Sequence, residues 1–445
     1  MGNTFGFLHT SEGGFQFTVV NACKAEGIDL NQTCHLTFAK GQELLSIGNV
    51  TRGTMKAMPG IAGVGIWFAM MVFFGTIVIA FLFVVLEILT RWRKTDSTAF
   101  AFFKESPPND PDNPSGRRRK RDILKAAGRT FVLGVADTQT IFVGAFLLGF
   151  AGQTKCRLTS YHFTVAVNQM MIALSVITFS VALVRTYWRN PLVAGLRLLL
   201  SFGAFVGVGL MIFRKANYAP DWPPPKTRKD SAILLPVACL LETDLRTRAQ
   251  EQADESKADL GFGKSTAWPL ERFFFMGLIV AFIVAHLSVP IRFAENRSRD
   301  RQHGPWRARW TKFRGWITVA YWAAMLVPPT FISVWCWIHV YRVRDWVKDS
   351  GWMETPNAEF MIWDAGQLIA IGVLITVLNN VLTEAWRRDS KGAGSPRDGA
   401  FQRLTGGDAS SAYEERRSNS YPMAHMGRDV RTGYQGYEEA PSRRW

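Results

Sequence analysis

Long apolar runs alternate with polar segments along most of the chain. A helix that crosses the hydrocarbon core of a bilayer needs roughly 20 apolar residues, and seven runs approach or exceed that length. They cover residues 61–86, 138–152, 163–184, 198–213, 273–291, 316–341 and 365–383. Each run is continuous rather than alternating, and lipid-exposed backbone must form its hydrogen bonds within its own segment. The pattern therefore predicts an all-α fold, a polytopic membrane bundle of seven transmembrane helices.

Basic residues decide the expected orientation of this bundle. The chain carries 52 Lys and Arg against 36 Asp and Glu, a formal charge of +16, although 48% of its residues are hydrophobic. Most basic residues fall in the gaps on one side of the bundle, above all in 117–121 (RRRKR) and 292–314. Because cytosolic loops are enriched in Lys and Arg, we expect the N-terminus outside and the C-terminus in the cytosol. The basic side suits anionic lipid head groups, and we predict no nucleic-acid partner.

The same pattern divides the chain into three parts. We expect an extracytoplasmic segment 1–60, a membrane domain 61–386 and a disordered cytosolic tail 387–445. Within the membrane domain, 91–121 is a Pro-rich charged cytosolic linker and 214–272 is an extracytoplasmic loop. The linker and the tail have too little apolar surface to fold alone. The N-terminus lacks the pattern of a cleavable signal peptide, so the first helix would direct the chain to the plasma membrane or another secretory-pathway membrane.

Four cysteines fall on the predicted outer side, where an oxidising compartment favours disulfides. Four cysteines allow three pairings. We favour Cys23 with Cys34 and Cys156 with Cys239, because each bond would pin one outer segment; the alternative leaves some of them free. The same outer segment holds two glycosylation sequons, at Asn31 and Asn49. Asn31 is the better candidate because Asn49 lies closer to the first helix.

Asp137, at the start of the second apolar run, has two interpretations. In the favoured one, 122–135 is an amphipathic helix in the membrane interface, the chain turns at Gly134, and Asp137 caps the next helix. In the other, 130–152 is one straight span. That span would place the carboxylate about 10 Å below its end, at a rise of about 1.5 Å per residue, where an acid is a candidate functional group.

Four short motifs lie near the ends of the predicted helices: GIAGVGI at 60–66, ADTQTIFVG at 136–144, CRLTSYH at 156–162 and PVAC at 236–239. Together they resemble the motifs of a large, mostly uncharacterised group of seven-helix integral membrane proteins of filamentous fungi. The chain departs from them by Gly60 in place of a usual acid and by Thr159 in place of a usual serine. The resemblance covers residues 58–385 and implies the seven-helix architecture, but no activity.

Polar groups at the outer helix ends give the candidate site. Tyr161 and His162 come from the mouth of the third predicted helix, and Asp364 and Gln367 from the mouth of the seventh. Together they could line an outward-facing pocket; the alternative is that they anchor the helices at the interface. Deeper polar residues are expected to form hydrogen bonds between helices; they are Asn168, Gln169, His286, Asn379 and Asn380.

Three functions compete on this pattern. The orientation, the outer cysteines and the basic cytosolic face favour a receptor- or sensor-like binding protein. A membrane-embedded enzyme, such as a terpene cyclase, would need clustered carboxylates for magnesium, and the sequence shows no such cluster or other metal motif. A small-molecule transporter usually shows internal repeats, which we do not detect. We therefore predict no metal, no cofactor and no catalytic residues, and we leave the ligand and the oligomeric state open.

Overall fold

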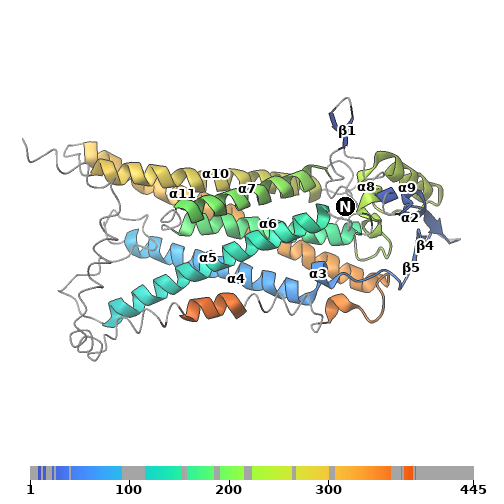
Figure 1. Cartoon of the computed structure of the whole chain (residues 1–445), viewed down its shortest axis with the longest axis horizontal. Coiled ribbons are helices and arrows are strands. Elements are labelled where there is room, and N and C mark those ends of the chain that lie inside the picture. Colours follow the sequence, from blue (N-terminus) through green and yellow to red (C-terminus); the bar gives the residue numbers. More distant parts are fainter. Residues whose placement is uncertain are drawn as a thin grey trace, which may run out of the picture. The chain divides into compact units, whose positions relative to one another are not determined.

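The computed structural model describes residues 9–11, 14–16, 23–24, 27–39, 42–92, 116–151, 156, 158–184, 191–214, 223–262, 267–299, 306–361, 372, 375–383 and 386. Most of them are helical (Figure 1). The tail 387–445 and most of the linker 91–121 lie outside these residues, as do Asp364 and Gln367. The prediction of a helical membrane protein is confirmed in its general form, as the helix lengths show.

Six long helices run through the described chain. They are α4 (Val64–Trp92), α5 (Gly116–Ala151), α6 (Ser160–Leu183), α7 (Pro191–Arg214), α10 (Ala267–Arg299) and α11 (Trp306–Ser350). Among the described residues, five stretches have the length and composition of membrane spans: Thr130–Phe150, Ser160–Leu183, Pro191–Phe213, Leu270–Ser288 and Ala320–Ser350. The chain is therefore a multi-pass membrane protein in contact with a lipid bilayer.

Helix α6 lies at the centre of the bundle. It contacts α4, α5, α7, α10 and α11, and each of its residues is buried. Several of its hydroxyls bond to its own backbone, for example Ser175 Oγ to the carbonyl of Met171 and Thr178 Oγ1 to that of Leu174. The surrounding helices carry the lipid-facing side chains, including exposed Leu199 and Leu210 on α7 and exposed Phe273 and Val280 on α10. Hydrophobicity alone does not separate these roles, since α6 and α7 are both apolar.

A second compact region, which we call the cap, covers the ends of α6 and α11. It consists of the described residues of 23–57, 223–262 and 351–361, and Figure 1 shows it at one end of the long helices. Its elements are α2 (Leu30–Thr33), η2 (Ala232–Leu234), α8 (Val237–Leu241), α9 (Thr243–Glu255), η3 (Ala358–Phe360) and an antiparallel sheet of β3 (Leu36–Phe38), β4 (Leu44–Ile47) and β5 (Val50–Thr51).

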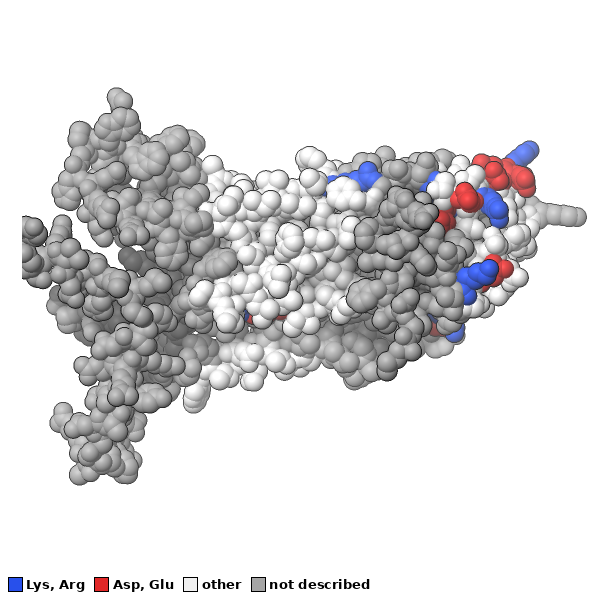
Figure 2. Space-filling model, turned by 45° about the horizontal axis from the view of Figure 1, so that its top comes forward, with Lys and Arg blue, Asp and Glu red and all other residues white. Residues whose placement is uncertain are grey.

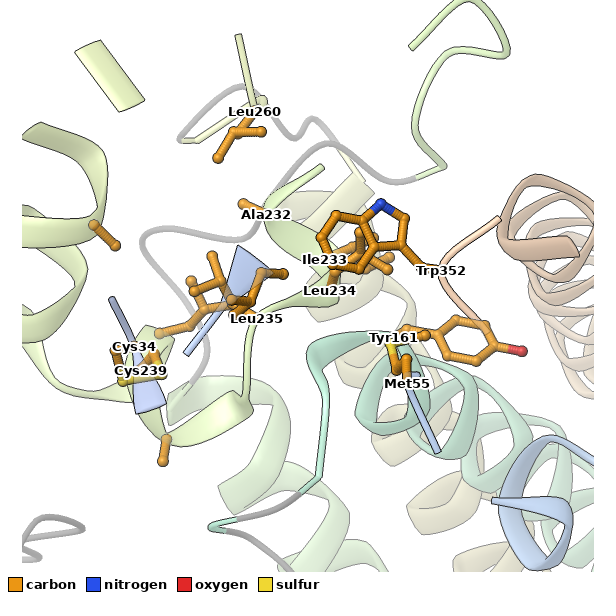
Figure 3. Packing of buried hydrophobic residues seen from close by; sticks show 14 of the residues in the cluster. Cys34, Met55, Tyr161, Ala232, Ile233, Leu234, Leu235, Cys239, Leu260 and Trp352 are labelled. Atoms are coloured by element: carbon orange, nitrogen blue, oxygen red, sulfur yellow. A yellow bond between two sulfur atoms is a disulfide. The ribbon is translucent and has the colours of Figure 1, made fainter. Parts of the chain in front are cut away.

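The cap has its own apolar core. Figure 3 shows the segment from Ala232 to Leu235 packed beside Trp352 and near Met55, with Leu260 above it. Charged side chains gather on the cap surface, whereas the visible described part of the helical body is mostly uncharged (Figure 2). The cap is thus built like a small water-soluble unit attached to a membrane bundle.

The cap strands are missing from the all-α prediction. Besides β3 to β5, a hairpin of β1 (His9–Ser11) and β2 (Gly14–Gln16) lies in the N-terminal segment. All five are two to four residues long, too short for the alternation that marks strands in a sequence. The turn between β4 and β5 needs Gly48, whose φ is +56° and whose added Cβ would lie 2.8 Å from the carbonyl oxygen of Thr33.

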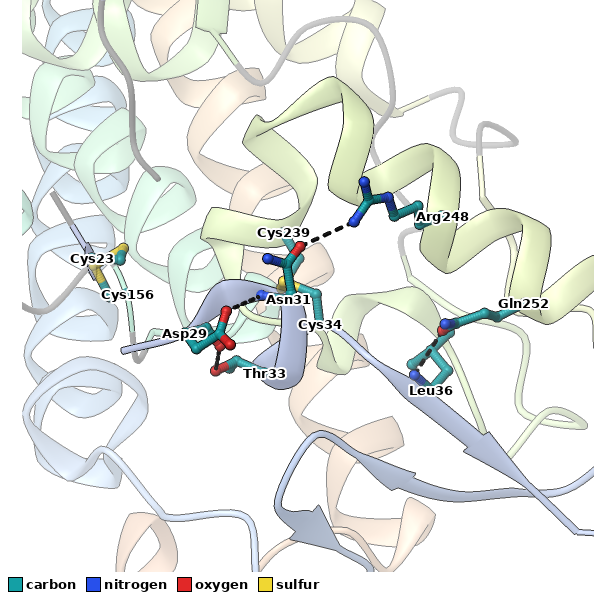
Figure 4. Close-up of a disulfide and its surroundings, with 10 residues drawn as sticks. All are labelled: Cys23, Asp29, Asn31, Thr33, Cys34, Leu36, Cys156, Cys239, Arg248 and Gln252. Atoms are coloured by element: carbon teal, nitrogen blue, oxygen red, sulfur yellow. Dashed lines mark hydrogen bonds between the residues drawn. A yellow bond between two sulfur atoms is a disulfide. The ribbon is translucent and has the colours of Figure 1, made fainter. Parts of the chain in front are cut away.

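Two disulfides hold the N-terminal part of the cap, one within the cap and one to the segment ahead of α6, and their pairing differs from the expected one. Cys23 bonds to Cys156, and Cys34 bonds to Cys239 (Figure 4). The expected pairs, Cys23 with Cys34 and Cys156 with Cys239, are therefore wrong. Both real bonds connect the N-terminal segment to later parts of the chain, so each joins segments that a sequence-local argument treats separately. The fifth cysteine, Cys336, is free and buried in α11.

The interpretation of Asp137 as the N-cap of a helix is also wrong. Helix α5 runs without a break from Gly116 to Ala151, so Gly134 makes no turn and Asp137 lies inside the helix. The carboxylate instead pairs with Arg197 of α7, whose Nε donates to Oδ1 at 2.7 Å and whose Nη2 donates to Oδ2. The alternative of one straight span holds, and the acid in it forms an ion pair between two membrane helices. The side chain of Asp137 is 42% exposed and that of Arg197 is 25% exposed.

Candidate functional site

The mouth of α6 holds a closed cluster of polar side chains, which we call the mouth cluster. Its members are Tyr161 and His162 in the first turn of α6 and Glu359 in η3, and all three are fully buried. Tyr161 Oη donates to Glu359 Oε2 at 2.9 Å, and His162 Nε2 lies 2.7 Å from Glu359 Oε1. Glu359 follows Tyr161 and His162 by nearly 200 positions in the sequence, yet its carboxylate bonds to both side chains.

Local structure explains how each member is positioned. Thr159 is the N-cap of α6, and its hydroxyl lies 2.6 Å from His162 Nδ1, so both ring nitrogens of His162 are engaged. Asn357 caps η3 by accepting from the backbone N–H of Glu359. The carboxylate also accepts from the backbone N–H of Met58, at 3.0 Å. Three segments of the chain therefore meet at Glu359.

These contacts set the charge of Glu359. Burial by itself would raise the pKa of this carboxyl, but hydrogen bonding and charge from His162, together with the bonds from the Met58 N–H and Tyr161, outweigh burial and lower the pKa below its ordinary value of 4.5. A carboxylate with this many donors is held in the ionised form. The mouth cluster therefore joins the cap to the central helix through one buried carboxylate, and we call this joint the lock.

The two described residues of the predicted outer pocket do not line an open pocket. Tyr161 and His162 do come together, but they are covered by protein and bonded to Glu359 instead of facing solvent. Glu359 was not among the predicted site residues. The sequence does contain a signal for Glu359. Asn357, two residues before it, is a preferred N-cap residue, and an acid in the first turn after such a cap can contact a histidine at the end of another helix.

A second polar contact lies inside the bundle. Glu271, at the start of α10, is fully buried, and its Oε1 accepts a 2.9 Å bond from Asn168 Nδ2 of α6. Asn168 Nδ2 also reaches the carbonyl of Thr164, while the neighbouring Gln169 donates to the carbonyl of Ile61. The expected interhelical bonding of Asn168 and Gln169 is thus present. Glu271 escaped prediction because the apolar run seemed to begin at Phe273.

The two sequons lie on the cap surface. Asn31 is exposed in α2, where Asp29 caps its backbone N–H and Arg248 Nη1 donates to its Oδ1 at 3.1 Å (Figure 4). Asn49 is exposed in the turn between β4 and β5. Glycosylation at either position remains a prediction. In the described part of the chain, no three His, Cys, Asp or Glu side chains group as metal ligands would.

These features stand on geometry alone, without support from relatives. A function can be argued from three features: the lock at the mouth of α6, a buried carboxylate on α10 and a disulfide-bonded cap. When the chain is compared with protein-family models, with curated proteins and with solved structures, nothing matches.

Proposed function

We propose that this chain is a receptor- or sensor-like binding protein with seven membrane helices. In this proposal the cap lies outside the cytosol, together with the N-terminus, and the basic ends of the helices contact anionic head groups in the cytosolic leaflet. The two disulfides support this side for the cap, because disulfides persist in secretory compartments. The membrane would be the plasma membrane or another in that pathway.

Two further helices complete the proposed seven. Helix α4 has 29 residues, and at a rise of about 1.5 Å per residue it is long enough to cross about 30 Å of hydrocarbon. The seventh corresponds to the apolar run 365–383, of which the structure describes 372 and 375–383, all helical. An odd number of spans puts the two chain ends on opposite sides, which agrees with the distribution of basic residues.

The observation that carries the sensing role is the mouth cluster. A ligand that moves the cap must act on Glu359, which bonds directly to the first turn of α6. Helix α6 contacts all the other long helices, so a shift at its mouth is passed to the whole bundle. In proteins whose packed helices have two arrangements, small movements at one face become changes at another, and the proposal assigns this behaviour to the bundle around α6.

The test uses the organism that encodes the protein. A deletion strain is profiled for transcripts and metabolites and then complemented with the wild-type gene, with Glu359→Gln, with His162→Ala and with Glu251→Gln, which alters an exposed acid of α9. We expect wild type and Glu251→Gln to restore the profile. The two mouth-cluster variants should reach the membrane at normal level and fail to restore it.

A different outcome would reject the proposal. Full restoration by both mouth-cluster variants would remove the lock from any signalling role. The loss of one defined metabolite, with no wider response, would instead favour a membrane-embedded enzyme or transporter.

That alternative has one observation in its favour, the buried Glu271. An ionisable side chain inside a membrane bundle is a functional candidate by default, and its partner here is Asn168. Under this alternative, Glu271→Gln should abolish the metabolite or flux while Glu359→Gln leaves it intact. The sensing proposal expects the reverse order of effects.

A further inference from the structure

A cationic and aromatic group of side chains lies at the rim of the bundle, on the cap side. We call it the rim cluster: Trp67 of α4, Trp337, Tyr341, Arg344 and Lys348 of α11, and Phe360 of η3. The three rings of Trp67, Trp337 and Tyr341 lie within 6.1 to 6.4 Å of one another, centroid to centroid. Trp and Tyr gather where a membrane meets water, because their rings are apolar and their tips are polar.

Arg344 is the buried charge of this cluster, and it has few partners. Its side chain is only 7% exposed, and its one hydrogen bond to a described residue is a long one, from Nη1 to the carbonyl oxygen of Gly63 at 3.4 Å. Its guanidinium is held over the rings of Phe360 and Trp67, at 5.2 and 6.0 Å. A guanidinium has five N–H donors and is always charged, so most of its bonding capacity is unused.

Two described carboxylates that adjoin the rim cluster in the chain are already engaged. Glu359, next to Phe360 in the chain, bonds to His162, Tyr161 and Met58. Asp345, next to Arg344, pairs with Lys226 at 2.8 Å. Arg344 forms no ion pair with any described residue, so within the part of the chain that the structure describes the rim cluster offers positive charge without a counter-ion.

Two more donors point to the same kind of ligand. The indole Nε1–H groups of Trp67 and Trp337 are buried without a hydrogen-bond acceptor in the described structure. Buried donors of this kind normally find a partner. On the same rim, Lys348 lies 5.8 Å from the Phe360 ring and is exposed. The missing groups are therefore all acceptors, and at least one should be an anion.

We propose that the rim cluster binds a lipid with an anionic head group, in the leaflet on the cap side. The head group is bound by Arg344 and Lys348, and the apolar chain follows Trp67, Trp337 and Tyr341 into the membrane. The inference rests on the proposed function for its biological meaning, because it names the class of ligand that such a receptor would bind. Phe360 adjoins Glu359, so an occupied rim lies next to the lock of α6.

The test measures binding on the purified full chain in detergent, by native mass spectrometry and thermal shift. The probes are phosphatidylglycerol, phosphatidylcholine with the same acyl chains, and inorganic phosphate. We expect phosphatidylglycerol to bind roughly tenfold more tightly than phosphatidylcholine, since both carry an anionic phosphate but the quaternary ammonium of phosphatidylcholine cancels the net charge and is repelled by Arg344 and Lys348. Phosphate alone should give no shift, because it lacks the chain.

Three variants and one control locate the site. Arg344→Gln should weaken binding about tenfold, and Lys348→Gln about threefold. Trp337→Phe keeps the ring and removes the N–H donor, and should weaken binding about twofold to threefold. Arg342→Gln removes an equal charge from an exposed position on the same helix, and should leave binding unchanged. If Arg344→Gln fails to fold, Lys348→Gln and Trp337→Phe carry the test.

Three results would overturn the proposal: equal affinity for the two lipids, an equal shift from phosphate alone, or equal weakening by Arg342→Gln. Because binding is measured without cells, these results leave the sensing role of the mouth cluster untouched. Conversely, if the mouth-cluster variants restored the deletion strain, the sensing proposal would be rejected, whereas the proposal of lipid binding at the rim would be unaffected.

Discussion

The cap and the bundle solve the same problem of stability by different means. The cap joins distant segments with two disulfides, which span 133 and 205 residues, and with side chains such as Asp230, which accepts from Leu44, Arg52 and Trp352. In the bundle, the hydroxyls of α6 bond to their own helix. In lipid, apolar burial gives helices no drive to associate, whereas each helix keeps its own backbone bonded.

This difference predicts where the molecule is fragile. Membrane helices stay inserted when a contact between them is lost, because the bilayer itself holds them. The helices and strands of the cap are short, so its stability depends on the two disulfides and on individual side-chain hydrogen bonds. Changes in the cap should therefore cost more than changes of similar chemistry in the bundle.

Loss of a disulfide should have the largest effect. Cys34→Ser removes the bond to Cys239 on which α2 and α8 converge, and we expect a loss of about 2–5 kcal/mol of cap stability. Limited proteolysis of membranes should show the N-terminal segment cleaved while the helices stay protected. The double variant Cys34→Ser with Cys239→Ser should match the single one. Cys336→Ala, a change in the bundle, is the comparison, and cap cleavage by it at the same rate would break the contrast.

Asp230 comes next. Asp230→Ala leaves the Trp352 indole and the Leu44 N–H without their acceptor and removes one of the two carboxylate partners of Arg52, which keeps Glu43. It should cost roughly 2–4 kcal/mol. The matched control is Asp259→Ala, because Asp259 pairs with Arg228 at the surface and surface pairs contribute about 0–1 kcal/mol. Thermal shift in detergent measures both. Equal shifts would show that the three bonds of Asp230 contribute nothing special.

Glu359→Gln tests the join between the two regions. We expect a loss of about 2 kcal/mol at neutral pH, because three charge-assisted bonds become neutral ones. The folded state lowers the pKa of this carboxyl, so its contribution is complete above the unfolded pKa and disappears as the pH falls through the lower folded value. Wild type should therefore lose stability on acidification below about pH 4.5, and the variant should lose less.

The ion pair of the bundle gives a smaller effect. A double-mutant cycle with Asp137→Asn and Arg197→Gln should show a coupling of about 1 kcal/mol, in the range found for polar contacts between membrane helices. Unfolding of the purified protein in detergent measures it. A coupling of zero would be the result expected for an isolated helix cap, since Asn caps as well as Asp.

The sequon at Asn31 should have the smallest energetic effect and the clearest topological one. We expect a glycan there that an endoglycosidase removes, seen as a mobility shift that Asn31→Gln abolishes. The change in stability should stay within about 0.5 kcal/mol, as for most surface substitutions. An unshifted wild-type band, together with a cytosolic protease site in the cap, would place the cap on the other side of the membrane.

Sequence reasoning worked where one physical rule dominates. Length and apolar content found the helices α6, α7, α10 and α11, because crossing lipid demands both. It failed at Asp137, where the local cap preference competed with a distant partner: Arg197 lies 60 residues away, and only packing of α5 on α7 brings it close. The disulfide pairing failed for the same reason, since proximity along the chain was used in place of proximity in space.

The candidate site shows the same limit. Tyr161 and His162 stood out as polar groups at a helix mouth, and they do bond to a common partner. That partner, Glu359, lies in a short turn with no periodic pattern, and its burial follows from the approach of Met58 and α6. Glu271 was hidden because the predicted apolar run began at Phe273, three residues after the observed span begins at Leu270. Helix ends are the least certain part of a prediction from sequence, and Glu271 lies near one.

The complete enclosure of α6 bears on how the protein is made. Every residue of α6 is buried, and α10 and α11 supply part of the packing around it; Asn168, for example, bonds to Glu271 of α10. Those helices emerge from the ribosome later. At about 5–20 residues per second, the third helix waits on the order of ten seconds beside lipid or inside the insertion machinery. Biogenesis of this chain should therefore depend on a chaperone that shields the polar side chains of this apolar helix until the last spans arrive.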